Sequence, residues 1–199
     1  AQKRALLRGT GAADRELLET YNAQLAQAGG ELIAARAGYV DALSRAATSA
    51  HAALGIEGDV QVVYRGNVEQ DAFAQRLAER MTLEIARKTP LVGPHRDEVD
   101  LLLEGVSLAA FGSQGQKRGV VLALKLGEHA VLREGSGEAP LLLLDDVLSE
   151  LDESRQRRFI EVIAPFEQVF LTATLLPGGL DVPATVYTVE AGALGGVAC

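Results

Sequence analysis

A run of four leucines followed directly by two aspartates constrains this chain more than any other feature of its sequence. Residues 141–144 are uniformly apolar, which is typical of a strand buried on both faces of a parallel sheet. Asp145 and Asp146 emerge at the carboxyl end of this strand, the edge where ligands bind in open α/β sheets. The first carboxylate can hold a hydrated Mg²⁺ that bridges nucleotide phosphates, and the second can orient or deprotonate an attacking water. Taken alone, the segment also fits a strand that ends in a polar turn.

A second segment suited to phosphate lies upstream, at the start of a long predicted helix. Residues 111–118 place Ser113, Gly115 and Gln116 at the beginning of a helix that we expect to run to about residue 133. A helix N-terminus presents free N–H groups and the positive end of the dipole, and Gly115 lets a ligand approach the backbone. A capped helix after a glycine turn is the simpler interpretation, but the pairing with two downstream aspartates favours a nucleotide site.

The remaining pattern predicts a helical region followed by an α/β lobe. Helix-forming residues dominate 1–55, and Gly29-Gly30 divides them into two helices, over about 14–28 and 31–54, expected to form an antiparallel hairpin. Strands and helices alternate farther along, which predicts an α/β fold with a parallel sheet. We place the boundary between a helical domain (1–88) and the lobe (89–199). The other expected elements are strands over 60–64, 99–103, 106–108, 169–171 and 185–189, and helices over 71–88 and 152–163.

Composition and charge limit the classes of function. The net charge of −8 argues against a simple nucleic-acid binder, because phosphate neutralisation needs clustered Lys and Arg. A DNA contact would need a local basic patch or a region outside this chain. Cys199 is the only cysteine and no apolar run is long enough to span a bilayer, so we expect a cytoplasmic protein without a membrane partner. The candidate basic positions are Lys3, Arg4, Arg8, Arg36, Arg45, Lys117, Arg118, Arg155, Arg157 and Arg158.

These segments, in this order, resemble the motifs of the ATP-binding-cassette (ABC) ATPases. Residues 113–116, Ser-Gln-Gly-Gln, resemble the signature motif, whose usual form is Ser-Gly-Gly-Gln, and the leucine–aspartate run resembles Walker B. Ser149 and Asp152 occupy positions of the D-loop, which crosses a dimer interface, and Asp152 can cap the following helix as well. A cassette ATPase then delivers a switch residue, usually a His, to the γ-phosphate. Here Thr172 or Thr174 offers a hydroxyl instead.

One family matches the whole set of motifs. Residues 91–98, which include Gly-Pro-His-Arg-Asp, together with 111–118, 142–152 and 168–174, resemble the RecF family, whereas 1–88 resemble its helical second lobe by pattern only. No Gly-x-x-x-x-Gly-Lys-[Ser/Thr] occurs in the sequence, so the phosphate-cradling loop that this family carries near its N-terminus is missing. We therefore expect the chain to be the C-terminal half of a longer protein and to be inactive alone. His95 and Arg96 receive no role.

The resemblance implies a DNA-repair ATPase that uses ATP and Mg²⁺. Members of the family bind DNA, form an ATP-dependent homodimer, and act with RecO and RecR at DNA gaps to load RecA. By position, Ser113, Gly115 and Gln116 would contact the γ-phosphate of a nucleotide held by the other subunit. Asp145 would hold Mg²⁺ through water, and Asp146 stands at the catalytic-base position. An Asp there, where transporters usually have Glu, is consistent with slow, DNA-stimulated hydrolysis used as a switch.

Two other interpretations stay open. A chromosome-maintenance (SMC-like) ATPase head would carry long coiled-coil arms, and the helical region here lacks sustained heptads. A non-enzymatic docking or dimerisation module would use Asp145 and Asp146 only structurally. A transporter nucleotide-binding domain is disfavoured because the switch His is missing.

Overall fold

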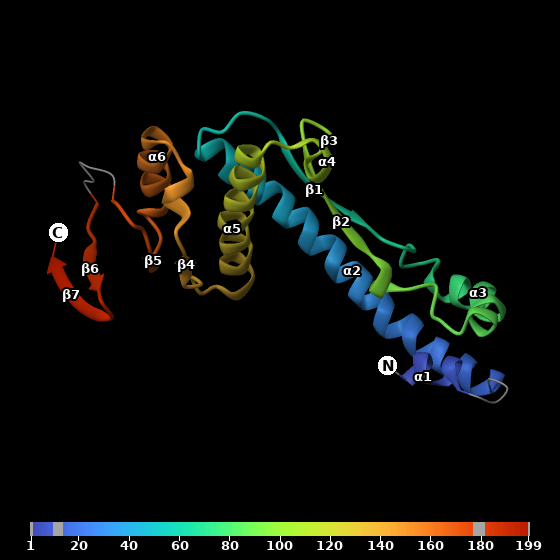
Figure 1. Ribbon diagram of the computed structural model, residues 1–199. Helices are drawn as coiled ribbons and strands as arrows, with labels where there is room; N and C mark the ends of the chain where they lie inside the picture. The colour runs from blue at the N-terminus through green and yellow to red at the C-terminus, as the bar shows by residue number, and fades with distance from the viewer. Residues whose placement is uncertain (1, 10–13, 177–181, 199) are drawn as a thin grey trace. The chain divides into compact units, whose positions relative to one another are not determined.

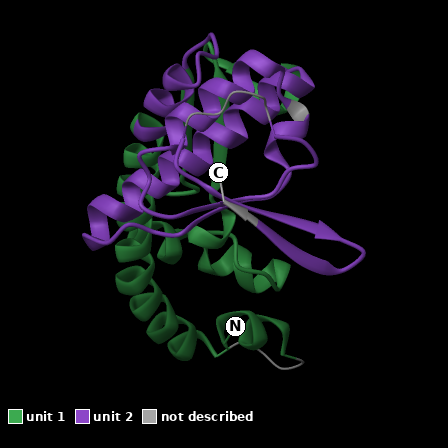
Figure 2. Cartoon of the chain, turned by 90° about the vertical axis from the view of Figure 1, so that its left-hand side faces the viewer, with its two compact units in different colours: residues 1–45, 60–111 green, residues 46–59, 112–199 purple. Residues whose placement is uncertain are grey.

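The structure, a computed structural model, describes residues 2–9, 14–176 and 182–198, and Cys199 lies outside these ranges. The chain divides into two compact units, which are coloured separately in Figure 2. Unit 1 comprises residues 1–45 and 60–111, and unit 2 comprises residues 46–59 and 112–199. The boundary that we expect at residue 88 concerns functional lobes and stays a prediction.

Helix α2 (Arg15–Ala53) passes without interruption through Gly29 and Gly30, so the expected helical hairpin is wrong (Figure 1). Each glycine costs a helix roughly 1 kcal/mol relative to alanine. The reason for Gly29 is packing within unit 1, because a Cβ atom at this position would lie only 2.4 Å from Cε1 of Phe73. Phe73 is buried, so the missing side chain lets its ring sit directly on the backbone of α2.

Unit 1 contains a three-stranded antiparallel sheet in the order β1-β2-β3, with β1 (Val60–Arg65), β2 (Glu98–Leu103) and β3 (Val106–Ser107). The predicted strands and hairpin are confirmed. Glu104 and Gly105 both have positive φ values, 53° and 73°, as a type I′ hairpin turn requires. The amide of Val62 donates a 2.9 Å hydrogen bond to Ser44 Oγ, which ties β1 to α2.

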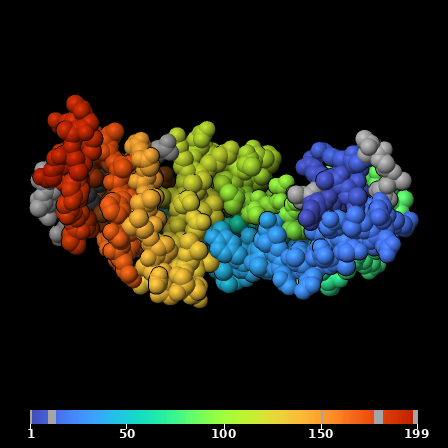
Figure 3. Space-filling view, turned by 90° about the horizontal axis from the view of Figure 1, so that it is seen from below, coloured from blue at the N-terminus to red at the C-terminus, as the bar shows by residue number. Residues whose placement is uncertain are grey.

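Short helices complete unit 1. They are α1 (Gln2–Arg8), α3 (Phe73–Arg87), the 3-10 helix η1 (Pro94–Arg96) and α4 (Leu108–Phe111). Leu7 of α1, Leu18 of α2 and Met81 of α3 form one buried cluster, and Figure 3 shows α1 beside the first turns of α2. A buried ion pair of 2.6 Å joins Lys3 Nζ to the Glu84 carboxylate and fixes α1 to α3.

Unit 2 holds the parallel strands that the sequence predicts. Its elements are α5 (Gln114–Ser136), β4 (Leu142–Leu144), the 3-10 helix η2 (Val147–Glu150), α6 (Glu153–Ile163), β5 (Val169–Leu171), β6 (Thr185–Glu190) and β7 (Ala193–Ala198). Strand β4 pairs in parallel with β5, with Leu142 opposite Val169 and Leu144 opposite Leu171. Strands connected through a helix in this way give the predicted α/β class.

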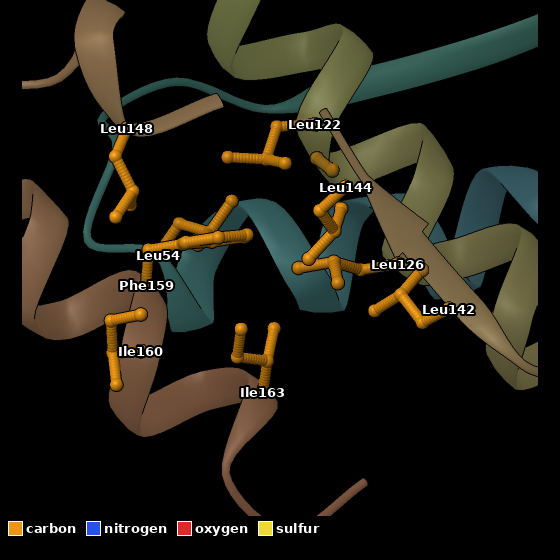
Figure 4. Packing of buried hydrophobic residues seen from close by; sticks show 10 residues of the cluster. Leu54, Leu122, Leu126, Leu142, Leu144, Leu148, Phe159, Ile160 and Ile163 are labelled. Carbon is orange, nitrogen blue, oxygen red and sulfur yellow. The ribbon is translucent and has the colours of Figure 1, made fainter. Parts of the chain in front are cut away.

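The core of unit 2 lies between α5, α6 and the strand pair. Figure 4 shows Leu126 of α5, Leu142 and Leu144 of β4, and Phe159 of α6 in one cluster. Helix α5 also approaches the last turns of α2 closely at Gly127, where a Cβ atom would lie 2.8 Å from the backbone nitrogen of Ala47. These contacts hold the end of β4 in a fixed place beside α6.

One expectation about the strands is wrong for the described residues. Leu143 is 67% exposed and Phe170, its partner in register, is 54% exposed, so β4 and β5 are buried on one face and not on both. Alternate side chains of a strand point to opposite faces, and only the face of Leu142 and Leu144 meets the core. The strand expected over 185–189 is confirmed as β6, and it pairs with β7 as an antiparallel hairpin separate from the parallel pair.

Candidate nucleotide site

The ends of β4 and β5 bring Asp145, Asp146 and Thr172 together. The amide of Thr172 donates to the carbonyl oxygen of Leu144 at 2.9 Å, which continues the parallel pairing past the last residue of each strand. The Thr172 hydroxyl then donates a hydrogen bond to Asp145 Oδ1 at 2.5 Å. The same hydroxyl oxygen accepts a hydrogen bond from the amide of Asp146 at 3.0 Å. One hydroxyl thus holds the first carboxylate and the backbone of the second residue in place.

Asp146 begins the turn that leads from the strand into η2. Its backbone is left-handed, with φ 49° and ψ 30°, a conformation that Asp tolerates better than most residues. The Ser149 hydroxyl donates to the carbonyl oxygen of Asp146 at 2.9 Å, and the Thr172 hydroxyl accepts its amide. Both backbone groups of Asp146 are therefore bonded, while its side chain is exposed.

Asp152 ends the following turn and caps α6. Its Oδ1 atom accepts hydrogen bonds from the Arg155 amide at 2.9 Å and the Ser154 hydroxyl at 2.7 Å, so the predicted cap is confirmed. The Ser154 hydroxyl and the Arg155 amide hold the pKa of Asp152 below its usual value. Gln156 steadies the same turn, since its side-chain amide donates to the carbonyls of Leu148 and Leu151 at 2.8 and 3.1 Å. The motifs do not include Gln156, although its position one turn after the helix cap is a signal that the sequence carries.

The start of α5 is a capping box formed by two of the predicted site residues. Ser113 Oγ accepts the amide of Gln116 at 3.2 Å, and Gln116 Oε1 accepts the amide of Ser113 at 2.9 Å. Both residues and Gly115 are exposed, and a Cβ atom on Gly115 would meet nothing within 4 Å. The segment therefore combines a capped helix with an open backbone surface, and capping does not exclude contact with a phosphate.

The structure brings together some of the predicted site residues and not others. Thr172 contacts both aspartates, whereas Thr174 lies exposed in a bend and makes no hydrogen bond within the described chain. Of the two candidates for the switch position, Thr172 is thus the one in contact with the aspartates. Ser113 and Gln116 hydrogen-bond each other and not the aspartates in the part of the chain described here.

The oxygen atoms at the end of β4 fit a magnesium–phosphate site. Mg²⁺ prefers carboxylate and water oxygens and usually takes only one or two protein carboxylates beside nucleotide phosphates. Asp145 and Asp146 are both exposed at the strand end, where such an ion can reach them. The described residues contain no group of three or more His, Cys, Asp or Glu side chains that could hold a metal ion. The donor set therefore suits a hydrated ion shared with a nucleotide better than a closed protein cage.

A separate cluster in unit 1 accounts for Asp97, the last residue of the Gly-Pro-His-Arg-Asp segment. The Asp97 side chain is only 3% exposed and accepts hydrogen bonds from the Tyr64 hydroxyl, the Asn67 amide at 2.9 Å and Arg36 Nη1 at 3.4 Å. Arg36 also donates to the carbonyl oxygen of Pro94 at 2.6 Å. Asp97 thus ties β1, α2 and η1 together in unit 1. Burial, and then the bond to Asp97, raise the pKa of Tyr64.

His95 and Arg96, which received no role from the sequence, differ in their surroundings. His95 is exposed, and its ring lies close to Gly93. Arg96 donates two hydrogen bonds, from Nε and Nη2, to the carbonyl oxygen of Pro90 at 3.3 and 3.2 Å. Arg96 therefore braces the loop before η1, a structural role that only the folded chain reveals.

Solved structures show the class of fold. The chain matches an SMC ATPase with a TM-score of 0.52 at 15% identity, and an SMC head bound to the winged-helix domain of ScpA with a TM-score of 0.53 at 15% identity. At such low identity these matches show the fold alone. The chain has the fold of part of an ABC-type P-loop ATPase head, in which a parallel sheet with flanking helices is joined to a helical part. No family model matches the chain.

Closer relatives identify the family. The chain is 40% identical over 195 residues to the DNA replication and repair protein RecF of Limosilactobacillus fermentum, with 91% of this chain and 52% of the relative covered. It is 36% identical over 204 residues to RecF of Desulfitobacterium hafniense, with 98% and 56% covered. A structure of the recombination mediator protein RecF with ATP, from the RecFOR pathway, gives a TM-score of 0.78 at 27% identity, over 99% of this chain and 55% of that one. This chain belongs to the RecF family, and it spans about half the length of the curated relatives that it matches.

Within the described ranges, no helix is both long enough and apolar enough to cross a membrane.

Proposed function

We propose that this chain is the signature- and Walker B-bearing part of a cytoplasmic, DNA-binding ATPase of recombinational repair. It would dimerise when ATP binds, hydrolyse ATP slowly under stimulation by DNA, and act at DNA gaps with RecO and RecR to promote RecA loading. The observation that carries the proposal is the grouping of Asp145, Asp146 and Thr172 at the carboxyl ends of two parallel strands. The membership in the RecF family supports it independently.

The two aspartates would have different tasks. Asp145 accepts a hydrogen bond from Thr172, which orients its carboxylate, and we assign it to the water shell of Mg²⁺. A bound Mg²⁺ supplies charge neutralisation for the transferred phosphoryl group. The Asp146 carboxylate has no hydrogen-bond partner among the described residues and is free to position the attacking water or accept its proton. Thr172, or less directly Thr174, would be the switch residue that faces the γ-phosphate beside these two aspartates.

The signature residues would act on a nucleotide held by a second copy. Ser113, Gly115 and Gln116 are exposed at the first turn of α5, a geometry that leaves N–H groups and a positive dipole end accessible to a phosphate. Ser149 and Asp152 lie in an exposed turn on the same unit, where they can contact the partner. This arrangement makes hydrolysis dependent on dimerisation, because each nucleotide needs residues from two chains.

The proposal is tested by reconstitution with a P-loop-bearing N-terminal half of a RecF relative. We expect DNA-stimulated ATP turnover from the pair, and a loss of roughly 100-fold or more with Asp146→Asn, since a positioned base contributes about that much. Ser113→Arg should abolish turnover and ATP-driven dimerisation together. Turnover that neither change affects would reject the site and favour a docking module. An Asp146→Glu variant that hydrolyses no faster would reject our account of slow hydrolysis.

A further inference from the structure

One side of α3 carries a row of arginines that lines a hollow in unit 1. Arg76, Arg80 and Arg87 are spaced so that they fall on one side of the helix. The hollow has a volume of about 320 Å³. Its lining consists of Asn67, Arg76, Arg80, Leu83, Arg87, Leu91 and Val92. None of these arginines is among the candidate basic positions that we name from the sequence.

The charge of this hollow is largely uncompensated. Arg76 pairs with Glu79 at 3.2 Å, but Arg80 and Arg87 form no ion pair within the described residues. The other acidic residue of α3, Glu84, is buried and neutralised by Lys3. The lining itself contains no carboxylate. A concentration of positive charge therefore exists in a chain whose net charge is −8.

We propose that this hollow binds the phosphodiester backbone of a nucleic acid. Arginine has a planar group with several N–H donors that matches phosphate oxygens, and a cationic concave surface attracts phosphate over a long range. From Arg76 to Arg87 the helix rises by about 16 Å at 1.5 Å per residue. This length is roughly half a helical turn of duplex DNA, enough to follow several phosphates along one strand.

The lining favours a nucleic acid over an acidic protein partner. Protein interfaces are usually centred on buried aromatic or aliphatic anchors, with charged groups at the rim. Here no aromatic residue lines the hollow, and the arginines form part of its wall. Leu83 and Leu91 are half-buried and Val92 is buried, so the apolar residues mainly support the arginines. The positive charge of the lining suits contact with phosphates and offers no base readout.

The inference rests on the proposed DNA-binding function and specifies its surface. The decisive variant is Arg80→Gln with Arg87→Gln in the reconstituted protein, and affinity for a gapped duplex is measured by fluorescence anisotropy over a range of salt concentrations. Each lost phosphate contact lowers the slope of log affinity against log salt by about 0.9. We expect the slope to fall by roughly 2 and the affinity to fall between ten- and a hundred-fold near 0.1 M salt.

Two control variants define the interpretation. Arg15→Gln with Arg65→Gln removes the same charge from unit 1, but these arginines already pair with Glu19 and Asp100, so the slope should change little. Arg80→Lys with Arg87→Lys keeps the charge and should keep the slope. If the Arg15 and Arg65 control lowers the slope of log affinity against log salt equally, the effect comes from net charge alone and the proposed site is rejected.

The remaining outcomes separate the surface from the function. If the unsubstituted protein binds no DNA, both the DNA-binding function and this site are rejected. If it binds DNA and the Arg80 and Arg87 change leaves the salt slope unaltered, only the site is rejected. An acidic protein then becomes the favoured partner of the hollow. Inorganic phosphate at a few millimolar should not displace DNA. Displacement at that concentration would mean a small-anion site and would also overturn the proposal.

Discussion

The hydroxyl of Thr172 lies 2.5 Å from Asp145 Oδ1 and accepts the amide of Asp146, so a residue after β5 fixes both aspartates after β4. Thr172→Val removes these bonds and keeps the shape of the side chain. We expect ATP turnover of the reconstituted protein to fall about ten-fold or more, because a hydrogen bond to a charged group contributes about 1.5–3 kcal/mol. Thr172→Ser should retain most of the activity. Equal activity of the Val and Ser variants would contradict this role.

Gly115 tests whether a ligand approaches the start of α5. A Cβ atom there meets nothing within 4 Å in this chain, so Gly115→Ala should leave the free energy of unfolding unchanged or slightly raised. ATP turnover should nevertheless fall at least ten-fold if a phosphate contacts this backbone. Gly135→Ala, on the same helix and equally open, should leave turnover unaltered. Equal turnover in both variants would remove Gly115 from the site.

Gly29 and Gly30 should respond oppositely to the same substitution. Gly29→Ala places a Cβ atom against buried Phe73, and overpacking of this kind costs roughly 1–3 kcal/mol, which outweighs the helix gain of about 1 kcal/mol. Gly30→Ala meets only Gln70 Cγ at 3.7 Å, an ordinary contact, so it should stabilise the chain by up to about 1 kcal/mol. Urea unfolding of the two variants measures the difference. Stabilisation by both would show that the ring of Phe73 can move away.

Asp97 should be important for the stability of unit 1. Asp97→Asn removes the charge from a nearly buried carboxylate that accepts from Tyr64, Asn67 and Arg36, and we expect a loss of about 2–4 kcal/mol in the free energy of unfolding. Asp100→Asn breaks an exposed pair with Arg65 and should cost less than about 1 kcal/mol. Urea unfolding of both proteins provides the comparison. Similar losses would mean that the Asp97 cluster is no stronger than a surface ion pair.

His51 should make stability dependent on pH. It is 1% exposed, and burial lowers its pKa below 6.5, an effect that the nearby backbone of Gly58 partly offsets. As the pH falls below about 6.5, the unfolded chain takes up a proton that the folded chain resists, so stability decreases until the lower folded pKa is reached. His51→Gln should flatten this dependence between pH 7.5 and 5, and an unchanged dependence in this variant would contradict the assignment to His51. Unfolding curves at several pH values decide between these results.

The parts of the fold that the sequence predicted were those with strong local patterns. Local sequence predicts the leucine run at 142–144, the Ser113 cap of α5 and the Asp152 cap of α6, because apolar periodicity and caps act within a few residues. The continuity of α2 could not be predicted from local sequence, because Gly29 makes room for Phe73, which lies far along the chain. The same holds for the one-sided burial of β4 and β5, which depends on the elements that cover them.

The candidate site shows the same division. The sequence by itself determined which residues are the candidates for the chemistry, since two aspartates after an apolar strand and a hydroxyl after the next strand are local features of the chain. Only the tertiary structure decided that Thr172, and not Thr174, contacts both aspartates, because parallel pairing of β4 with β5 sets that register. It also decided that Asp97 joins three elements and that the arginines of α3 line a hollow. Contacts between distant residues follow from packing, and short-range sequence patterns do not encode them.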